Sequence, residues 1–332
     1  MRSRWHQYAQ ESVTQLIRQV KHLNYKLRLL LTSLVISTSI VSCSWTNSTE
    51  TKDSYEIEKW KLGWRLISSS WDKNFQLGEQ QFDSLLKMNG VIETKFLVTG
   101  LDILSELDKK EKIISVLSKQ DQRTLEEICS KELFTKKLTD IQICKSIAKD
   151  ENVGNKTLQI ELIKMYINDQ SVRGNVLNEI ISKYKLDEYE ITKMDGVSID
   201  KVNRDRLREI IIEFGFPTRQ LVGKDAMQGI FLMIQHSDGD KEWQKEQLTN
   251  IERAVKQGDM DGQSYAYLYD RIKINGGEKQ LYGTQFKNVD PINKKVELAD
   301  TEDVENLDRR RMEVGMMPIH MYEQFMLRNL PK

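Results

Sequence analysis

The chain has 332 residues, and its 50 lysines and arginines balance 50 aspartates and glutamates, so the formal net charge is zero. No basic excess marks a nucleic-acid surface, and we expect no nucleic-acid partner. Hydrophobic residues make up 39% and charged residues 30% of the chain, as in a soluble globular protein of one or two domains. Four prolines and long stretches rich in Leu, Ile, Lys and Glu predict a mostly helical structure.

The first feature along the chain is a short apolar run, residues 29–42, that ends at Cys43. Basic residues stand before it (Lys21, Lys26, Arg28), and a polar Ser/Thr stretch follows. The run is too short to span a bilayer as a mature helix, and the pattern is typical of a secretory signal. The alternatives are a short buried core helix and an uncleaved N-terminal membrane helix.

Ile40-Val41-Ser42-Cys43 resembles the lipobox of bacterial lipoproteins. The resemblance implies that the cysteine sulfur receives a lipid, that the leader is cut before it, and that the new amine is acylated. Several acyl chains hold a protein on a membrane, at about 0.8 kcal/mol per buried CH₂. We therefore expect a signal peptide over 1–42, lipidation of Cys43, and an exported protein anchored to a membrane at its periplasmic or outer-surface face. Ser44, in place of Asp, favours the outer membrane.

Residues 43–70 are expected to hold the lipidated cysteine and a tether. Ser44 to Asp53 is a polar stretch that would let the folded part stand off the lipid surface. Trp60, Trp64 and Trp71 follow it. Tryptophans near a lipid anchor can rest at the membrane interface, but we favour the packing face of a helix.

Apolar residues at helical spacing predict consecutive amphipathic helices over about 75–190. The sets are Phe82, Leu85 and Leu86; Leu97, Leu101, Leu104 and Leu107; Ile113, Ile114 and Leu117; and Val176, Leu177, Ile180, Ile181 and Tyr184. We assign 71–156 to a helical region and 157–332 to a C-terminal domain. Cys129 and Cys144 lie singly among apolar neighbours. An exported compartment permits a disulfide, but we favour two buried free thiols.

The predicted C-terminal domain begins with four helices and then changes period. Asp200 is expected to cap a helix that ends at Gly215, and Asp240 a helix that ends at Gly258. The other elements are helices over about 224–236 and 263–271, a hairpin pairing 272–274 with 280–282 through Asn275-Gly276-Gly277, a second hairpin pairing 286–289 with 295–298, and a last helix over about 318–327. The predicted fold class is therefore mainly α (α+β), with one or two small β-hairpins.

An ordered set of polar pieces resembles an uncharacterised bacterial family, domain of unknown function 6624, over about residues 157–325. The pieces are Asp169-Gln170 with Arg173, Asn203 with Leu207, Gly215-Phe216-Pro217, Val222-Gly223, Gln235-His236-Ser237-Asp238, Ala266-Tyr267-Leu268 with Asp270-Arg271, Gln280 to Gln285, and Asp308 with Arg310-Arg311 and Gly315. Phe216 stands where the family usually has tryptophan. The resemblance implies a domain boundary and a site location, and no reaction.

The candidate site is centred on His236, one of two histidines after residue 43; the other is His320. His236 is the natural proton carrier near neutral pH, with Asp270 and Gln285 as further candidate catalytic residues. Candidate substrate-binding residues are Gln235, Arg271, Tyr282, Arg310 and Arg311, since arginines bind carboxylates and phosphates in pairs of hydrogen bonds.

Two functions remain open for this site. The first is a binding or interaction module with a polar pocket around His236, and the second is a His-dependent hydrolase or transferase acting on a phosphate- or carboxylate-bearing substrate. A structural interpretation competes with both. In it His236 closes a helix, Asp270 and Arg310 form a buried ion pair, and Gln285 satisfies hairpin backbone groups. No zinc site is expected, whereas a carboxylate-rich magnesium or calcium site stays open. The sequence identifies no cofactor and no protein or small-molecule partner.

Overall fold

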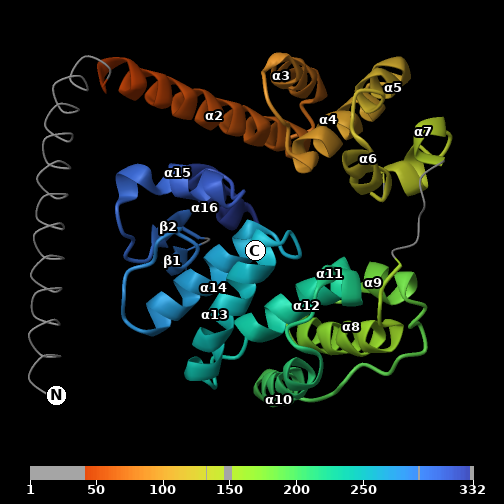
Figure 1. Cartoon of the computed structure of the whole chain (residues 1–332), viewed down its shortest axis with the longest axis vertical. Helices are drawn as coiled ribbons and strands as arrows, with labels where there is room; N and C mark the ends of the chain where they lie inside the picture. The colour runs from red at the N-terminus through yellow and green to blue at the C-terminus, as the bar shows by residue number, and fades with distance from the viewer. Residues whose placement is uncertain (1–41, 132, 146–151, 291, 330–332) are drawn as a thin grey trace, which may run out of the picture. The chain divides into compact units, whose positions relative to one another are not determined.

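The computed structural model describes residues 42–131, 133–145, 152–290 and 292–329 (Figure 1). Residues 1–41 of the predicted signal peptide and the side chain of Cys43 lie outside the described residues. The chain divides into two compact units, residues 1–59 and 60–332, and all contacts reported below lie within the second. In the described part of the chain, no helix is long and apolar enough to cross a membrane.

Helices dominate the described residues, with one two-stranded sheet, so the predicted mainly α fold class is confirmed. The first group of elements is α2 Ser42–Trp71, α3 Phe75–Lys87, α4 Thr94–Glu106, α5 Lys110–Leu117, α6 Gln122–Cys129, the π-helical turn η1 Leu133–Lys137 and α7 Gln142–Lys145. The stretch 44–53, predicted as a polar tether, is helical within α2. It contains no proline or glycine to interrupt a helix.

Trp60 and Trp64 of α2 have the predicted packing role. Trp60 and Trp64 are buried. The indole Nε1 of Trp60 donates to the carbonyl of Met316 at 2.9 Å, and the Trp64 ring meets Phe96 edge-on with centroids 5.7 Å apart. Trp71 remains 43% exposed and contacts the ring of Phe325.

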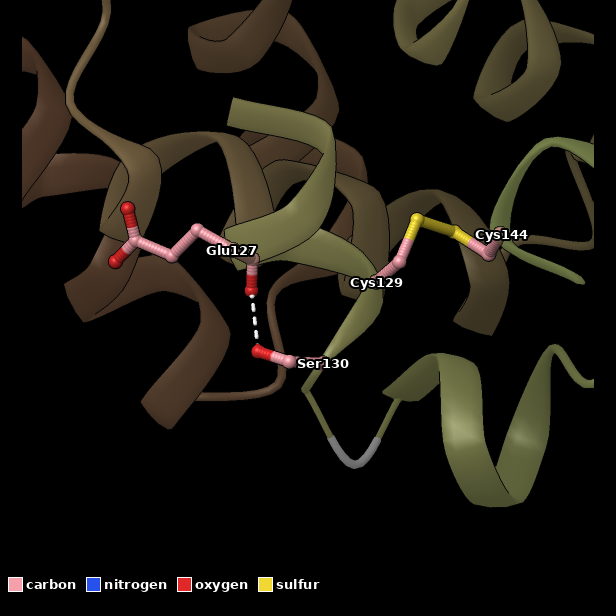
Figure 2. The surroundings of a disulfide bond; sticks show 4 residues. All are labelled: Glu127, Cys129, Ser130 and Cys144. Atoms are coloured by element: carbon pink, nitrogen blue, oxygen red, sulfur yellow. Dashed lines mark hydrogen bonds between the residues drawn. A yellow bond between two sulfur atoms is a disulfide. The ribbon is translucent and has the colours of Figure 1, made fainter. Parts of the chain in front are cut away.

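The prediction of two free thiols is wrong, because Cys129 and Cys144 form a disulfide (Figure 2). Cys129 ends α6, and the turn η1 lies between it and α7, which carries Cys144. The two Cα atoms lie 5.2 Å apart, a distance that suits a disulfide. Periodicity predicted that both side chains are buried, which the structure confirms, but it could not show that they face each other.

The second group of elements contains the domain that the sequence separated at residue 157. It comprises α8 Lys156–Ser171, α9 Asn178–Lys183, α10 Gly196–Phe214, α11 Arg219–Val222, α12 Lys224–Gln235, α13 Lys241–Lys256 and α14 Gly262–Asn275. Helix α8 packs along α12 and also contacts α10 (Figure 1). Apolar side chains such as Leu162, Ile210 and Ile234 are completely buried between them. These three helices therefore form one packed scaffold.

Two predicted helix boundaries in this group are wrong. Helix α10 begins four residues before Asp200, because the carboxylate of Asp195 caps it by accepting from the backbone N–H of Ser198. The amphipathic segment that was expected to start at Val176 is only the short helix α9, and Val176 is exposed. By contrast, Asp240 caps α13 as predicted, accepting from the N–H of Trp243.

One of the two predicted hairpins is present. The expected strand 272–274 is instead the last turn of α14, which continues to Asn275. The chain leaves that helix through Gly277, whose φ of 77° favours glycine. The second hairpin pairs β1 Phe286–Asp290 with β2 Lys295–Leu298 in antiparallel register. It is followed by the 3₁₀ turn η2 Val304–Asn306, α15 Leu307–Glu313 and α16 Ile319–Asn329.

Candidate functional site

His236 is held at the end of α12 by a buried carboxylate from α8. It is the C-cap residue of α12, and its backbone N–H donates to the carbonyl of Leu232 at 2.9 Å. Its ring Nδ1 lies 2.9 Å and 3.1 Å from the two carboxylate oxygens of Asp169. The Asp169 side chain is fully buried, whereas that of His236 is 14% exposed. This contact fixes the orientation of the imidazole and, among the described residues, leaves Nε2 without a hydrogen bond.

An arginine and a second carboxylate complete the surroundings of Asp169. Arg173, one turn later in the chain, donates from Nη1 to the Asp169 carbonyl at 2.7 Å and lies 3.4 Å from Oδ1. Its Nη2 donates to Asp200 Oδ1 at 2.7 Å. Gln170 donates to Asp169 Oδ2 at 2.8 Å. We call Asp169, Arg173, Asp200 and His236 the Asp–His cluster.

Arg271 belongs to a neighbouring ion pair with Asp238, two residues after His236. The guanidinium donates to both carboxylate oxygens, from Nε to Oδ1 at 3.0 Å and from Nη2 to Oδ2. Burial raises the pKa of Asp238, but the hydrogen bond and charge of Arg271 outweigh it, so this pKa lies below its ordinary value. Gln244 links Asp238 to the carbonyls of Ile234 and Gln235. The Asp238–Arg271 pair therefore fastens α14 to the segment that carries His236.

Asp270, a candidate catalytic residue, organises the backbone of the 280–285 loop. Its fully buried carboxylate accepts hydrogen bonds from the backbone N–H groups of Leu281, Tyr282 and Thr284, at 2.8 to 3.2 Å. Burial raises the pKa of this carboxyl, and the N–H donors oppose the rise. Among the described residues, no hydrogen bond joins Asp270 to His236.

Arg310 and Arg311 serve the same loop through its carbonyl groups. Arg310 donates to the carbonyl of Leu281 at 2.9 Å and pairs with Asp303, not with Asp270. Arg311 is fully buried and donates to the carbonyls of Tyr282 and Met317, both at 2.6 Å. Burial lowers the pKa of Arg311. The fold itself thus holds both guanidinium groups, although Nη2 of Arg311 is buried without a hydrogen-bond partner among the described residues.

The remaining candidates, Gln285 and Tyr282, also lie on this loop. The side chain that satisfies the hairpin backbone is Gln280, which donates to the carbonyls of Gln285 and Ala299 and accepts from the Gln285 N–H. The Gln285 amide donates to the Thr284 hydroxyl at 2.9 Å. Tyr282 meets the rings of Tyr265 and Tyr269 edge-on, and burial raises its pKa to about 12.

The structure therefore distributes the candidates over two groups. Gln235, His236 and Arg271 lie at or beside the Asp–His cluster, whereas Asp270, Tyr282, Gln285, Arg310 and Arg311 build the 280–285 loop. The sequence marks neither Asp169 nor Arg173 as a site residue and assigns Asp200 only the role of a helix cap. The signal that could have found two of them is the piece Asp169-Gln170 with Arg173, which belongs to the ordered set of polar residues.

The family model described as "Family of unknown function (DUF6624)" matches residues 156–329, a span that contains both groups of polar residues. No curated protein and no solved structure matches the chain.

Proposed function

Because this chain belongs to DUF6624, a family of unknown function, we propose its role from its own residues. It is a lipid-anchored protein of the bacterial cell envelope, and its family domain binds a ligand at the Asp–His cluster. The observation that carries the binding site is the contact of His236 Nδ1 with the fully buried carboxylate of Asp169. A buried carboxylate is costly to desolvate. The C-terminal end of α12 does not require this carboxylate, since the backbone N–H of His236 already donates to the carbonyl of Leu232.

The anchor is the lipid expected on Cys43, and the outer membrane is its favoured location. Two independent features support export. One is the lipobox-like Ile40-Val41-Ser42-Cys43 after a short apolar run. The other is the Cys129–Cys144 disulfide, because disulfides persist in oxidising compartments and are rare in the cytosol.

Metabolic labelling with a palmitate analogue, followed by membrane fractionation, tests the anchor. Cys43→Ala should abolish the label and release the protein from the membrane fraction. Cys129→Ala is the matched control, because it removes a different cysteine and should retain both label and membrane association. An unlabelled wild-type chain in the cytosolic fraction would overturn the proposed anchor.

The ligand of the Asp–His cluster is an anionic molecule, bearing carboxylate or phosphate. Arg173 lies against Asp169, which contacts the imidazole, and Arg271 lies against Asp238, two residues after His236. A guanidinium group is the side chain best suited to paired hydrogen bonds with such anions. Each arginine now pairs with an aspartate side chain, so an incoming anion would compete with those carboxylates.

A second candidate function, a His-dependent hydrolase or transferase, is favoured by one specific observation. The Asp169 carboxylate occupies Nδ1, which makes Nε2 the nitrogen that can take a proton from a nucleophile. This arrangement of a carboxylate behind an imidazole is common to many general bases.

Complementation of a strain that lacks the gene tests the binding site. His236→Ala should lose complementation while its melting temperature stays near that of the wild type. His320→Ala is the control, because His320 is exposed on α16 and lies outside the cluster. If His236→Ala lowered both complementation and melting temperature, the histidine would be structural. If it complemented fully, the site would not be needed for the function.

A further inference from the structure

We propose that Asp169, Asp200 and His236 bind a divalent transition-metal ion of the zinc or manganese class. The inference rests on the proposed function in one respect, since it takes the Asp–His cluster as the binding site. One ligand atom of each of the three residues lies within 4.8 Å of the others. They supply one imidazole nitrogen and two carboxylates, a mixed set that suits zinc or manganese better than magnesium or calcium, which prefer oxygen alone.

The separation of the first two ligand atoms is close to what a shared ion requires. Ligand atoms bonded tetrahedrally to one zinc at about 2.0–2.2 Å lie about 3.3–3.6 Å from each other. His236 Nδ1 and Asp169 Oδ1 lie 2.9 Å apart, at hydrogen-bond distance. An ion could therefore replace the hydrogen between these two atoms once they separate by about half an ångström. Asp200 is partly exposed, and its ligand oxygen already lies within 4.8 Å of the other two ligand atoms.

The scaffold holds the three ligands from three packed helices. Asp169 lies in the last turn of α8, Asp200 in the second turn of α10, and His236 at the end of α12. Helix α8 contacts both α10 and α12. Gln170 holds the other oxygen of Asp169, as outer-shell donors commonly hold a ligating carboxylate. A site on rigid elements with a supported first ligand costs little reorganisation when it binds.

Arg173 shows that this position already attracts positive charge. Its guanidinium lies between the two carboxylates, 2.7 Å from Asp200 Oδ1 and 3.4 Å from Asp169 Oδ1. The Arg173 side chain is 30% exposed, and a long arginine side chain can turn its head group to water. The ion would displace the guanidinium from the carboxylates, so Arg173 is a competitor of the metal. An anionic ligand could then bind the ion and the displaced guanidinium together.

The competition between Arg173 and the ion predicts results that an ordinary ion-pair network would not give. The full chain, purified in detergent and treated with a chelator, would be titrated with ZnCl₂ and with MnCl₂ by calorimetry. The wild type should bind one equivalent of at least one of these ions. Asp200→Asn and His236→Gln should each weaken binding about tenfold or more, which is a change of about 1.4 kcal/mol. Arg173→Gln should tighten binding, because it removes the competing cation.

Asp205→Asn is the matched control, since Asp205 lies on the same helix α10 outside the three ligands and should leave the affinity unchanged. Asp169 is avoided because its burial makes loss of folding the expected result, and every variant would be checked by its melting temperature. Failure of the wild type to bind either ion, or equal affinities in all four variants, would overturn the metal site. If metal binding failed but His236→Ala still lost complementation at an unchanged melting temperature, the proposed ligand site would stand without a metal.

Discussion

Two buried charged side chains shape the 280–285 loop at the level of single residues. Asp270 accepts from three backbone N–H groups of the loop, and Arg311 donates to the carbonyl of Tyr282 in the loop and to that of Met317. A loop with buried backbone needs such partners, because an unpaired buried polar group costs about 1–3 kcal/mol. Both residues therefore have a structural role that is independent of any ligand.

Replacing Asp270 by asparagine should test this role. One carboxylate oxygen becomes an NH₂ group, which would face N–H donors of the loop instead of accepting from them. The substitution should lower the free energy of unfolding by about 1–3 kcal/mol, as measured by urea denaturation. Asp300→Asn is the control, because the Asp300 side chain is 67% exposed. Equal effects of the two substitutions would contradict the role assigned to Asp270.

Tyr282 should make stability depend on pH in the alkaline range. Its pKa is raised by burial from 10.0 to about 12 in the folded protein. The unfolded chain therefore ionises first, and the contribution of Tyr282 to stability is present below pH 10 and lost as the pH rises towards 12. Denaturation of the wild type and of Tyr282→Phe across this range should show a steeper loss for the wild type. Parallel curves would contradict the prediction.

The sequence could identify His236 but not its partner. Histidine is rare after residue 43, and His236 ends an apolar helix. Asp169 lies 67 positions earlier, in a helix whose periodicity predicts only which face is buried. Pairings between faces of different helices are set by tertiary packing. The sequence likewise could not show the partners of Asp270, which it marks as a catalytic candidate. Its carboxylate accepts from backbone N–H groups of the 280–285 loop.

At the scale of elements, local signals predicted most helices and failed where two patterns overlap. The cap at Asp240 and the stop at Gly215 are where the sequence places them. Ile272-Lys273-Ile274 alternates as a strand does, but it also continues the apolar spacing of α14, and the helix prevails up to the glycines. Cap-forming residues were also ambiguous. Asp195 and Asp200 both precede apolar residues. The carboxylate of Asp195 is the one that accepts from a backbone N–H at the start of the helix, that of Ser198.

Close packing of α3 and α4 depends on Gly100. A Cβ atom added there would lie 2.3 Å from the ring of Phe82, which is completely buried. Gly100→Ala should therefore destabilise the protein by about 1–3 kcal/mol through overpacking, although alanine is the better helix former. Thermal denaturation would measure the effect.

Gly196 provides the matched comparison within an α-helix. A Cβ atom there would meet only Val172, at 4.0 Å. Gly196→Ala should be neutral or stabilising by up to about 1 kcal/mol. Two glycine-to-alanine changes of the same sign and size would show that the contact with Phe82 does not limit α4.

At the scale of the whole molecule, the described residues contain two hydrophobic cores. The first lies among the helices between residues 60 and 144 and includes Met321 of α16, with Met312 and Met317 packed against it. The second lies between residues 158 and 268. The last helices of the family domain thus contribute to the first core. The family match starts at residue 156, but no pattern in the sequence indicates that the C-terminal helices pack against the earlier helices.

The disulfide should stabilise the first core in particular. Cys129 and Cys144 are 15 positions apart, and closing a loop of this size stabilises a protein by about 3 kcal/mol through the unfolded chain. A reducing agent should therefore lower the melting temperature of the wild type. The double variant Cys129→Ala/Cys144→Ala should melt lower without a reducing agent and should not respond to one. If the reducing agent lowered the melting temperature of the double variant as much as that of the wild type, the effect would not come from this bond. The proposal of an oxidising compartment would then lose one of its two supports.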